Sequence, residues 1–156
     1  MYELEIISAA VAAGISPSIA LAVARRESGI KQFRPDGSVV TGTSGELGIF
    51  QVKPSTAPGV DLTDPSQNIK AGVGYLAQLY GQFGTWPLAV AAYNWGSGNV
   101  RRALAGALAV PTSVRNYVEG VLGPDQLDVT TAGKMTPAKV VVGAFVGAIV
   151  LLLVLR

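Results

Sequence analysis

The sequence predicts a mainly α domain followed by a single C-terminal transmembrane helix. Apolar residues recur at helical spacing in several segments of the first 122 residues, and helix-capping residues stand where these segments begin. Positions 140–155 are sixteen uncharged, apolar residues. We therefore divide the chain into a helical domain over residues 1–123, a polar linker over 124–137 and a transmembrane helix over 138–156.

The second predicted helix carries the residue on which the functional interpretation depends. Ser16 is a suitable N-cap, Pro17 suits the first helical position, and Gly29 suits the end. Between these ends, apolar residues recur on one face: Ile19, Ala20, Val23 and Ala24. Glu27 lies on the same face, so this helix presents a carboxyl group within an apolar stripe.

The other helices are predicted from the same kinds of signal. Residues 2–13 place Leu4, Ile7 and Val11 on one face. Later helices are predicted over 64–83, where Asp64 and Gln67 form a capping box, and over 85–93, 99–108 and 111–122. Residues 30–58 are rich in Gly, Pro, Ser and Thr, with short extended pieces expected at 39–40 and 49–52. We expect this irregular segment to pack beside the helix that carries Glu27, since such segments are often functional.

Glu27 is a candidate general acid on physical grounds. A carboxyl group on an apolar helix face is partly removed from water, and this raises its pKa. The negative end of the helix dipole acts in the same direction. Both effects favour a carboxyl that is protonated near neutral pH, as a general acid must be. The alternative is a residue that ends a surface helix and pairs with a nearby arginine.

The composition excludes several classes of chemistry. The chain has no Cys and no His, which excludes a Ser-His-Asp triad, a thiolate nucleophile and zinc sites built on these residues. Cleavage of sugars by carboxylates needs neither residue. We predict no metal and no other cofactor. The net charge of +2 and the scattered basic residues argue against a nucleic-acid partner.

Four motifs in order resemble the soluble lytic transglycosylase (SLT) domain family. They are Glu27-Ser28-Gly29, the segment 45–57 that begins Gly-Glu-Leu-Gly-Ile-Phe-Gln, the segment 91–100 that begins Ala-Ala-Tyr-Asn, and Tyr117-Val118. The resemblance covers roughly residues 5–122. It implies a lysozyme-like fold related to goose-type lysozyme, with the linker and the apolar tail outside it.

The resemblance also implies roles for individual residues. Glu27 matches the family's single catalytic glutamate. Gln51 matches the glutamine of a loop that lines the groove near the cleaved bond. Tyr93 and Asn94 match the Ala-Tyr-Asn motif that shapes the glycan site, and Tyr117 matches a tyrosine that would face the catalytic glutamate.

Some positions depart from the family pattern. The family's small hydroxyl residue corresponds to either Thr43 or Ser44, and we take Ser44 as a further substrate-binding candidate. Trp95 replaces a residue that is usually small, and it suits either the core or the groove rim. Tyr75 and Tyr80 lie on a predicted helix and are assigned to packing rather than to sugar contacts.

The resemblance implies a peptidoglycan lytic transglycosylase. Glu27 would protonate the glycosidic oxygen of the MurNAc-GlcNAc β-1,4 bond and then take a proton from the C6 hydroxyl, which closes a 1,6-anhydro ring. Glu46 and Asp36 are the candidates for a second carboxylate, although both fit solvated loop charges. If one faced Glu27, the alternative of a muramidase-type hydrolase would gain weight. A non-catalytic membrane or virion structural protein that retains the fold is the third possibility.

Residues 138–156 are predicted to sit in a lipid bilayer. Sixteen apolar residues span roughly 24 Å at ~1.5 Å per residue, and snorkelling by Lys139 and Arg156 helps to cover the ~30 Å core. Gly143 and Gly147 form a small-residue patch suited to helix–helix packing. A buried core helix is the alternative.

The flanking charges predict an unusual location. More basic residues precede the apolar run than follow it, which favours a cytoplasmic N-terminal domain. Peptidoglycan lies on the other side of a cell membrane, and no secretory signal is expected at the acidic N-terminus. We therefore expect either the membrane of a virus particle that digests the wall during genome entry, or a tail-anchored protein of the bacterial envelope.

Overall fold

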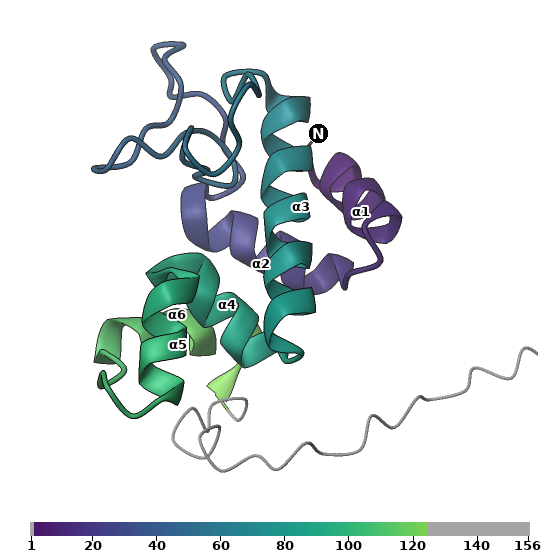
Figure 1. Cartoon of the computed structure of the whole chain (residues 1–156). Helices are drawn as coiled ribbons and strands as arrows, with labels where there is room; N and C mark the ends of the chain where they lie inside the picture. The colour runs from purple at the N-terminus through teal and green to yellow at the C-terminus, as the bar shows by residue number, and fades with distance from the viewer. Residues whose placement is uncertain (1, 125–156) are drawn as a thin grey trace, which may run out of the picture.

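The computed structural model describes residues 2–124. Within this range the chain forms six α-helices and isolated β-bridges, which confirms the predicted mainly helical domain (Figure 1). The helices are α1 Tyr2–Ala12, α2 Pro17–Ser28, α3 Pro65–Phe83, α4 Trp86–Trp95, α5 Ser97–Leu104 and α6 Thr112–Leu122.

Helix α3 runs through the middle of the domain and packs against α1 and α4 (Figure 1). Helix α1 packs against α2 and α3, α4 packs against α3, α5 and α6, and α6 also contacts α2. The buried side chains form two clusters. One joins α1, α2, the start of α3 and the irregular segment, and the other joins the end of α3 to α4, α5 and α6. The irregular segment between α2 and α3 lies at the N-terminal end of α3, beside the end of α2 (Figure 1).

Gly29 at the end of α2 and Asp64 at the start of α3 act as the predicted caps, whereas Ser16 stands at the N-cap of α2 but its side chain makes no capping hydrogen bond. Gly29 takes a left-handed conformation with φ of 67°, and its N–H donates to the Arg25 carbonyl at 3.0 Å. The Asp64 carboxylate accepts from the Gln67 N–H at 2.8 Å, as an N-cap should. In a standard capping box the Gln67 side chain would accept from the Asp64 N–H. Here it accepts from the Asp61 N–H instead, at 3.2 Å.

The prediction of a helix over 99–108 was wrong at both ends. Helix α5 begins at Ser97, so Gly98 lies inside its first turn, and only Gly96, with φ of 91°, separates it from α4. The helix ends at Leu104, shortly before Gly106 turns the chain with φ of 73°. The Ala- and Leu-rich sequence that follows Leu104 has high helical propensity, but the left-handed glycine prevents the helix from continuing.

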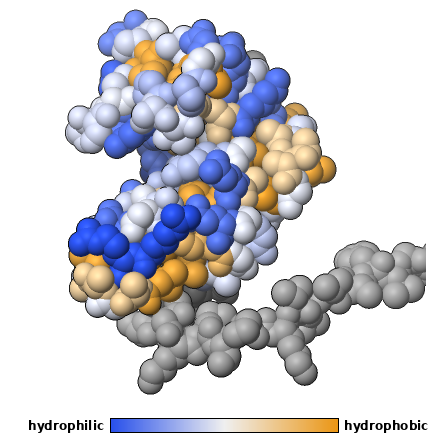
Figure 2. All heavy atoms as spheres, viewed as in Figure 1, coloured by the Kyte–Doolittle hydropathy of each residue, from blue (hydrophilic) through white to orange (hydrophobic). Residues whose placement is uncertain are grey.

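The face of α1 that carries Leu4, Ile7 and Val11 does not enter the core. Leu4 is 75% exposed and Val11 66% exposed, whereas Ile6 and Ala10 are fully buried. Figure 2 shows apolar surface over α1. The helix carries apolar residues on two faces, so spacing alone could not indicate which face is buried.

Two buried amides hold the irregular segment in place: Gln32, which bonds within the segment, and Asn68, which reaches it from α3. The Gln32 side chain donates to the Leu62 carbonyl at 2.9 Å and accepts from Ile49 N–H at 3.1 Å. The Asn68 side chain accepts from Phe50 N–H at 3.0 Å and donates to Leu47 and Leu62 carbonyls at 2.8 and 3.1 Å. These bonds satisfy backbone groups that no ladder satisfies, and they fix the segment although it contains no regular strand.

The expected extended pieces were only partly correct. Val39 pairs with Phe33, and Val52 pairs with Leu47, each in an isolated antiparallel bridge. Residues 49–51 form a turn instead of a strand, and Gln51 has φ of 47°. The buried amides hold this turn, so its apolar residues point into the core without needing a sheet.

Two glycines of α3 give a matched test of this packing. A Cβ on Gly72 would lie 2.2 Å from the Phe50 ring, whereas a Cβ on Gly74 would meet nothing within 4 Å. We expect Gly72→Ala to destabilise the fold by about 1–3 kcal/mol through overpacking. Gly74→Ala should instead stabilise it by about 0.5–1 kcal/mol, because alanine favours the helix. Urea denaturation of both variants measures the difference, and equal midpoints would contradict the packing described here.

The predicted transmembrane helix over 138–156 lies outside the described residues, as do Gly143 and Gly147. Among residues 2–124, none of the helices has the length and apolar character needed to span a bilayer.

Candidate active site

The C-terminal end of α2 places Glu27 in the wall of a groove. Its side chain is half-buried, on the same helix face as the fully buried Val23 and Ala24. The groove has a volume of about 410 Å³ and is lined by residues of α2, the irregular segment, α3 and α4. Figure 2 shows the surface hollowed between the irregular segment and the helices α4, α5 and α6, which lie below it in this view. The lining residues are Glu27, Gly42, Thr43, Glu46, Gln51, Val52, Lys53, Thr56, Tyr75, Tyr93, Asn94, Trp95 and Gly96.

Tyr117 on α6 donates a hydrogen bond from its hydroxyl to a Glu27 carboxylate oxygen. The tyrosine is buried, and the Arg26 guanidinium lies 5.9 Å from the centre of its ring. Burial and the adjacent Glu27 charge raise the pKa of Tyr117, so its hydroxyl keeps the proton that it donates. The structure thus brings together two residues that are ninety positions apart in the chain.

The pKa of Glu27 is raised above the usual value of a glutamate. Burial is the main cause, and the negative charge of Glu46 acts in the same direction. The hydrogen bond from Tyr117 and the positive charge of Arg26 lower the pKa without cancelling the effect of burial. A raised pKa favours the protonated form of Glu27, which is the form that a general acid requires.

Tyr93 and Asn94 lie at the end of α4 and both line the groove. The Tyr93 hydroxyl donates to the Phe50 carbonyl at 2.8 Å, which ties α4 to the irregular segment. The Tyr93 ring packs on Tyr75, with ring centres 5.4 Å apart. Burial and the charge of Glu27 raise the pKa of Tyr93, so this hydroxyl also stays protonated. Asn94 is exposed in the groove and keeps its amide available for a ligand.

Gln51 lines the groove as the resemblance implies, but its amide nitrogen is engaged by the protein. It donates to the Gly48 carbonyl at 2.8 Å and to the Val40 carbonyl at 3.2 Å. These bonds hold Gln51 in its left-handed conformation. Of the two hydroxyl candidates, Thr43 lines the groove, whereas Ser44 is exposed and does not.

Sequence reasoning placed too few residues in the groove. Glu46 and Lys53 line it, although Glu46 was expected to be a solvated loop charge. Tyr75 packs on Tyr93, as expected, and it also lines the groove, which was not expected. Asp36 is exposed, bonded to Ser38, and does not line the groove. The position of Glu46 inside the Gly-x-x-Gly motif was the available signal, because Gln51 of the same motif was already assigned to the groove.

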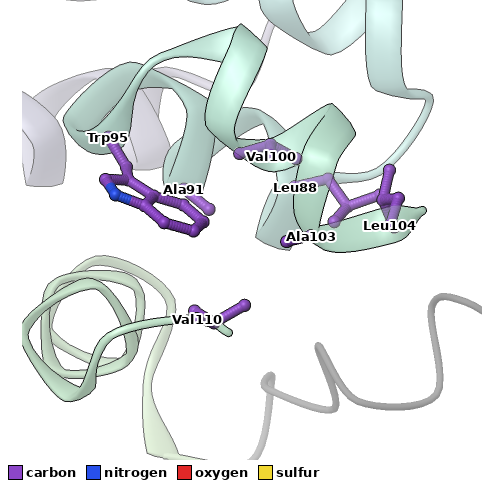
Figure 3. A pocket seen from close by; sticks show the side chains of 7 residues that line it. All are labelled: Leu88, Ala91, Trp95, Val100, Ala103, Leu104 and Val110. Atoms are coloured by element: carbon purple, nitrogen blue, oxygen red, sulfur yellow. The ribbon is translucent and has the colours of Figure 1, made fainter. Parts of the chain in front are cut away.

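Trp95 separates the groove from a small apolar cavity. It lines the groove on one side and, on the other, a cavity of about 10 Å³ (Figure 3). The other residues around this cavity come from α4, α5 and the loop before α6: Leu88, Ala91, Val100, Ala103, Leu104 and Val110. Such an apolar cavity, no larger than one water, has no polar partner for a water molecule. The tryptophan therefore belongs to both the core and the groove rim.

Among the described residues, no group of three or more acidic side chains is close enough to hold a metal ion. The groove residues that carry chemistry are carboxylates, tyrosines, amides and one lysine. Such a set can donate and accept protons and hydrogen bonds, which suits the recognition and cleavage of a polyhydroxylated ligand.

Removing the Tyr117 hydroxyl tests the hydrogen bond to Glu27. This bond stabilises the ionised carboxylate and lowers its pKa, so Tyr117→Phe is expected to raise the pKa of Glu27 further. The pKa can be measured from the pH dependence of the carboxyl ¹³C resonance. Tyr80→Phe, which changes a tyrosine stacked on Trp86 away from the groove, is the matched control and should leave it unchanged. A lower pKa in Tyr117→Phe would contradict the assigned hydrogen bond.

Comparison with known proteins places this site in a family. The family model described as "Transglycosylase SLT domain" matches residues 5–115. The soluble lytic murein transglycosylase of Salmonella typhimurium is 36% identical over 137 residues, and that of Escherichia coli is 35% identical over 136 residues. Each match covers 71% of this chain and 20% of the relative, so the chain spans about a fifth of the length of these relatives.

Solved structures show the same fold. The 70-kDa soluble lytic transglycosylase of E. coli superimposes with a TM-score of 0.67 and 31% identity, covering 78% of this chain and 23% of that one. An inactive mutant of the lytic transglycosylase Slt from Pseudomonas aeruginosa gives a TM-score of 0.65 and 28% identity, covering 77% and 22% of the two chains. With the family model matching residues 5–115, this chain belongs to the transglycosylase SLT domain family.

Proposed function

We propose that this protein is a peptidoglycan lytic transglycosylase in which Glu27 is the catalytic acid and base. The observation that carries the proposal is the setting of Glu27: a half-buried carboxyl with a raised pKa, hydrogen-bonded by Tyr117, in the wall of a polar groove. The relatives named soluble lytic murein transglycosylases support the substrate class. A Glu-to-Gln variant of the Pseudomonas relative is described as inactive, which supports a catalytic glutamate.

The proposed mechanism uses one carboxyl group twice, first as an acid and then as a base. Glu27 donates its proton to the oxygen of the MurNAc-GlcNAc β-1,4 bond, and the bond to the MurNAc anomeric carbon breaks. The C6 hydroxyl of the same sugar then attacks that carbon and returns its proton to Glu27, which closes the 1,6-anhydro ring. Because no water attacks, no second carboxylate is needed to activate one.

The other groove residues would bind and position the glycan. Asn94 offers both a donor and an acceptor to an N-acetyl group, and Tyr75 presents part of a flat ring to the groove. Tyr93 and Gln51 would act mainly by holding the groove in shape, because their polar groups already bond to the irregular segment. Ser44 donates its N–H to Glu46, so its proposed contribution to substrate binding is indirect.

Digestion of purified peptidoglycan tests the proposed function. The full chain is expected to release soluble fragments whose MurNAc ends are 1,6-anhydro sugars, lighter than reducing ends by one water. Mass spectrometry of the fragments distinguishes the two, and heat-inactivated protein is the control. Failure to release any glycan fragment would overturn the proposal.

A muramidase-type hydrolase of the same bond is the second candidate. It is favoured by one observation: Glu46 lines the same groove as Glu27 and is a second carboxylate there. Retaining and inverting hydrolases use such a pair, one member of which activates water or attacks the sugar. Reducing MurNAc ends in the digest would establish this function in place of the first.

We also propose that residues 138–156 anchor the enzyme in a lipid bilayer, with Gly143 and Gly147 available for helix–helix packing. The support is the uncharged apolar run of the sequence. We expect the protein in the membrane of a virus particle or otherwise in the bacterial envelope. Detection in purified virions, against detection only in host envelopes, decides between the two locations. Recovery in a soluble fraction after removal of membranes would contradict the anchor.

A further inference from the structure

We propose that Glu46 provides a fixed negative charge that stabilises the positively charged sugar formed when the glycosidic bond breaks. The inference rests on the proposed function and adds a residue to it. It assigns Glu46 neither proton transfer nor bond formation, but an electrostatic role from a neighbouring part of the same groove.

The structure holds the Glu46 carboxylate in place. One oxygen accepts from Ser44 N–H at 2.9 Å, and the other lies 3.3 Å from the Lys53 ammonium. The backbone of the same turn is closed by Gly42 N–H, which donates to the Glu46 carbonyl at 2.8 Å. The Glu46 side chain is only 23% exposed, less than half the exposure of Lys53 at 48%. A carboxylate held in this way needs little reorganisation when charge develops nearby.

Gly42 provides the space for this arrangement. A Cβ at that position would lie 2.5 Å from a Glu46 carboxylate oxygen and 2.7 Å from the Gln51 amide oxygen. The Glu46 and Gln51 oxygens therefore occupy the space that a side chain at position 42 would need. Gly42 itself lines the groove. The turn is built so that Glu46 lies against the groove beside Gln51.

The pKa values of the two groove carboxyls are shifted in opposite directions. Hydrogen bonds from the backbone of the turn, aided by Lys53, lower the pKa of Glu46. Burial, aided by the Glu46 charge, raises the pKa of Glu27. The other groups that act on Glu27 are Tyr117 and Arg26, and both lower its pKa. There is thus a pH interval in which Glu27 is protonated and Glu46 is ionised, as an acid and an anionic stabiliser require.

This pair of states suits cleavage of a glycosidic bond. When the bond breaks, its electron pair goes to the leaving oxygen, which takes the proton from Glu27, and the sugar ring acquires oxocarbenium character. An anion already fixed in the groove lowers the energy of that cation. The C6 hydroxyl then forms the new bond and its proton goes to Glu27. Glu46 is ionised before, during and after these steps.

Glu46→Gln in the full chain is the direct test, with Asp36→Asn as the matched control. Glutamine keeps an acceptor for Ser44 N–H but removes the charge, whereas Asp36 is a carboxylate of the same irregular segment that does not line the groove. We expect kcat on peptidoglycan to fall roughly 10- to 100-fold in Glu46→Gln with little change in KM. Asp36→Asn should retain the wild-type kcat. A rise in KM with unchanged kcat would indicate only ground-state binding and would overturn the inference.

Two further measurements separate the inference from other roles. The pKa of Glu27, measured by carboxyl ¹³C resonance, should fall in Glu46→Gln and stay constant in Asp36→Asn, which a purely structural role would not produce. The anhydro ends of the product should be unchanged. If Glu46→Gln instead removed reducing ends, Glu46 would be a base for water and the inference would be wrong. A wild-type chain that cleaves nothing would overturn the proposed function as well, whereas a Glu46→Gln variant with the wild-type kcat would overturn this inference alone.

Discussion

The Glu27→Gln variant is expected to lose about 10²–10⁴-fold in the rate of peptidoglycan cleavage, the usual contribution of a general acid. Glutamine keeps the size of the side chain and an oxygen that can accept from Tyr117, but it has no proton to donate. Release of soluble fragments from purified peptidoglycan measures the rate. Glu119→Gln, which changes an exposed glutamate of α6, should retain the wild-type rate.

The same variant should not lose stability. The pKa of Glu27 is raised in the folded protein, so its contribution to stability is fully present below the unfolded pKa. That contribution is lost as the pH rises through the folded pKa, because a half-buried carboxylate must then be charged. Glutamine does not titrate, and Glu27→Gln is therefore expected to gain stability relative to wild type as the pH increases through this interval. Cleavage at the wild-type rate by a folded Glu27→Gln protein would eliminate Glu27 as the acid.

The second large effect is expected from Asn68→Ala. Asn68 is fully buried on α3 and makes hydrogen bonds with backbone groups of Leu47, Phe50 and Leu62. Alanine leaves the Phe50 N–H without a partner, at a cost of about 1–3 kcal/mol. It also removes one hydrogen bond, worth about 0.5–1.5 kcal/mol, from each of the Leu47 and Leu62 carbonyls, which keep their bonds from Val52 N–H and from the Gln32 amide. We expect the free energy of unfolding to fall by about 3 kcal/mol or more, a large part of the ~5–15 kcal/mol typical of a domain.

Urea denaturation gives this free energy, and Gln78→Ala is the control. Gln78 is exposed on the same helix, so its replacement should change the midpoint little. Peptidoglycan cleavage should also fall in Asn68→Ala under conditions in which the protein is still folded, because Asn68 holds the turn that ends at Gln51. An unchanged midpoint would mean that the irregular segment does not depend on this amide.

The helices that sequence reasoning placed well are those whose ends carry specific chemistry. Gly29 and Asp64 each satisfy backbone groups at a helix end, so their identity alone marks the position. The end of α5 was missed because propensity favours helix beyond Leu104, and only the left-handed Gly106 stops it. On α1, two apolar faces competed, and tertiary packing selected Ile6 and Ala10.

The site residues on helices were mostly predicted, whereas the irregular segment was predicted only in part: Gln51 lines the groove as expected, but Glu46 and Lys53 were not assigned to it. The order of the motifs indicated Glu27, Tyr93 and Tyr117, each of which a helix presents. The contacts of Glu46 are made in a turn, and a turn has no periodic sequence pattern. The Gln32 amide is buried in the structure, whereas the sequence alone suggests a polar surface residue. No local pattern reveals that a polar side chain will satisfy the backbone of a distant turn.

The bond between Glu27 on α2 and Tyr117 on α6 has a consequence for biosynthesis. The ribosome delivers the chain from its N-terminus, so Glu27 emerges long before the tyrosine that completes its surroundings. Until α6 has packed against α2, the other residues that line the groove can be in place, but Glu27 lacks its hydrogen bond from Tyr117. A nascent chain that has not yet formed α6 therefore lacks the hydrogen bond that Tyr117 donates to Glu27.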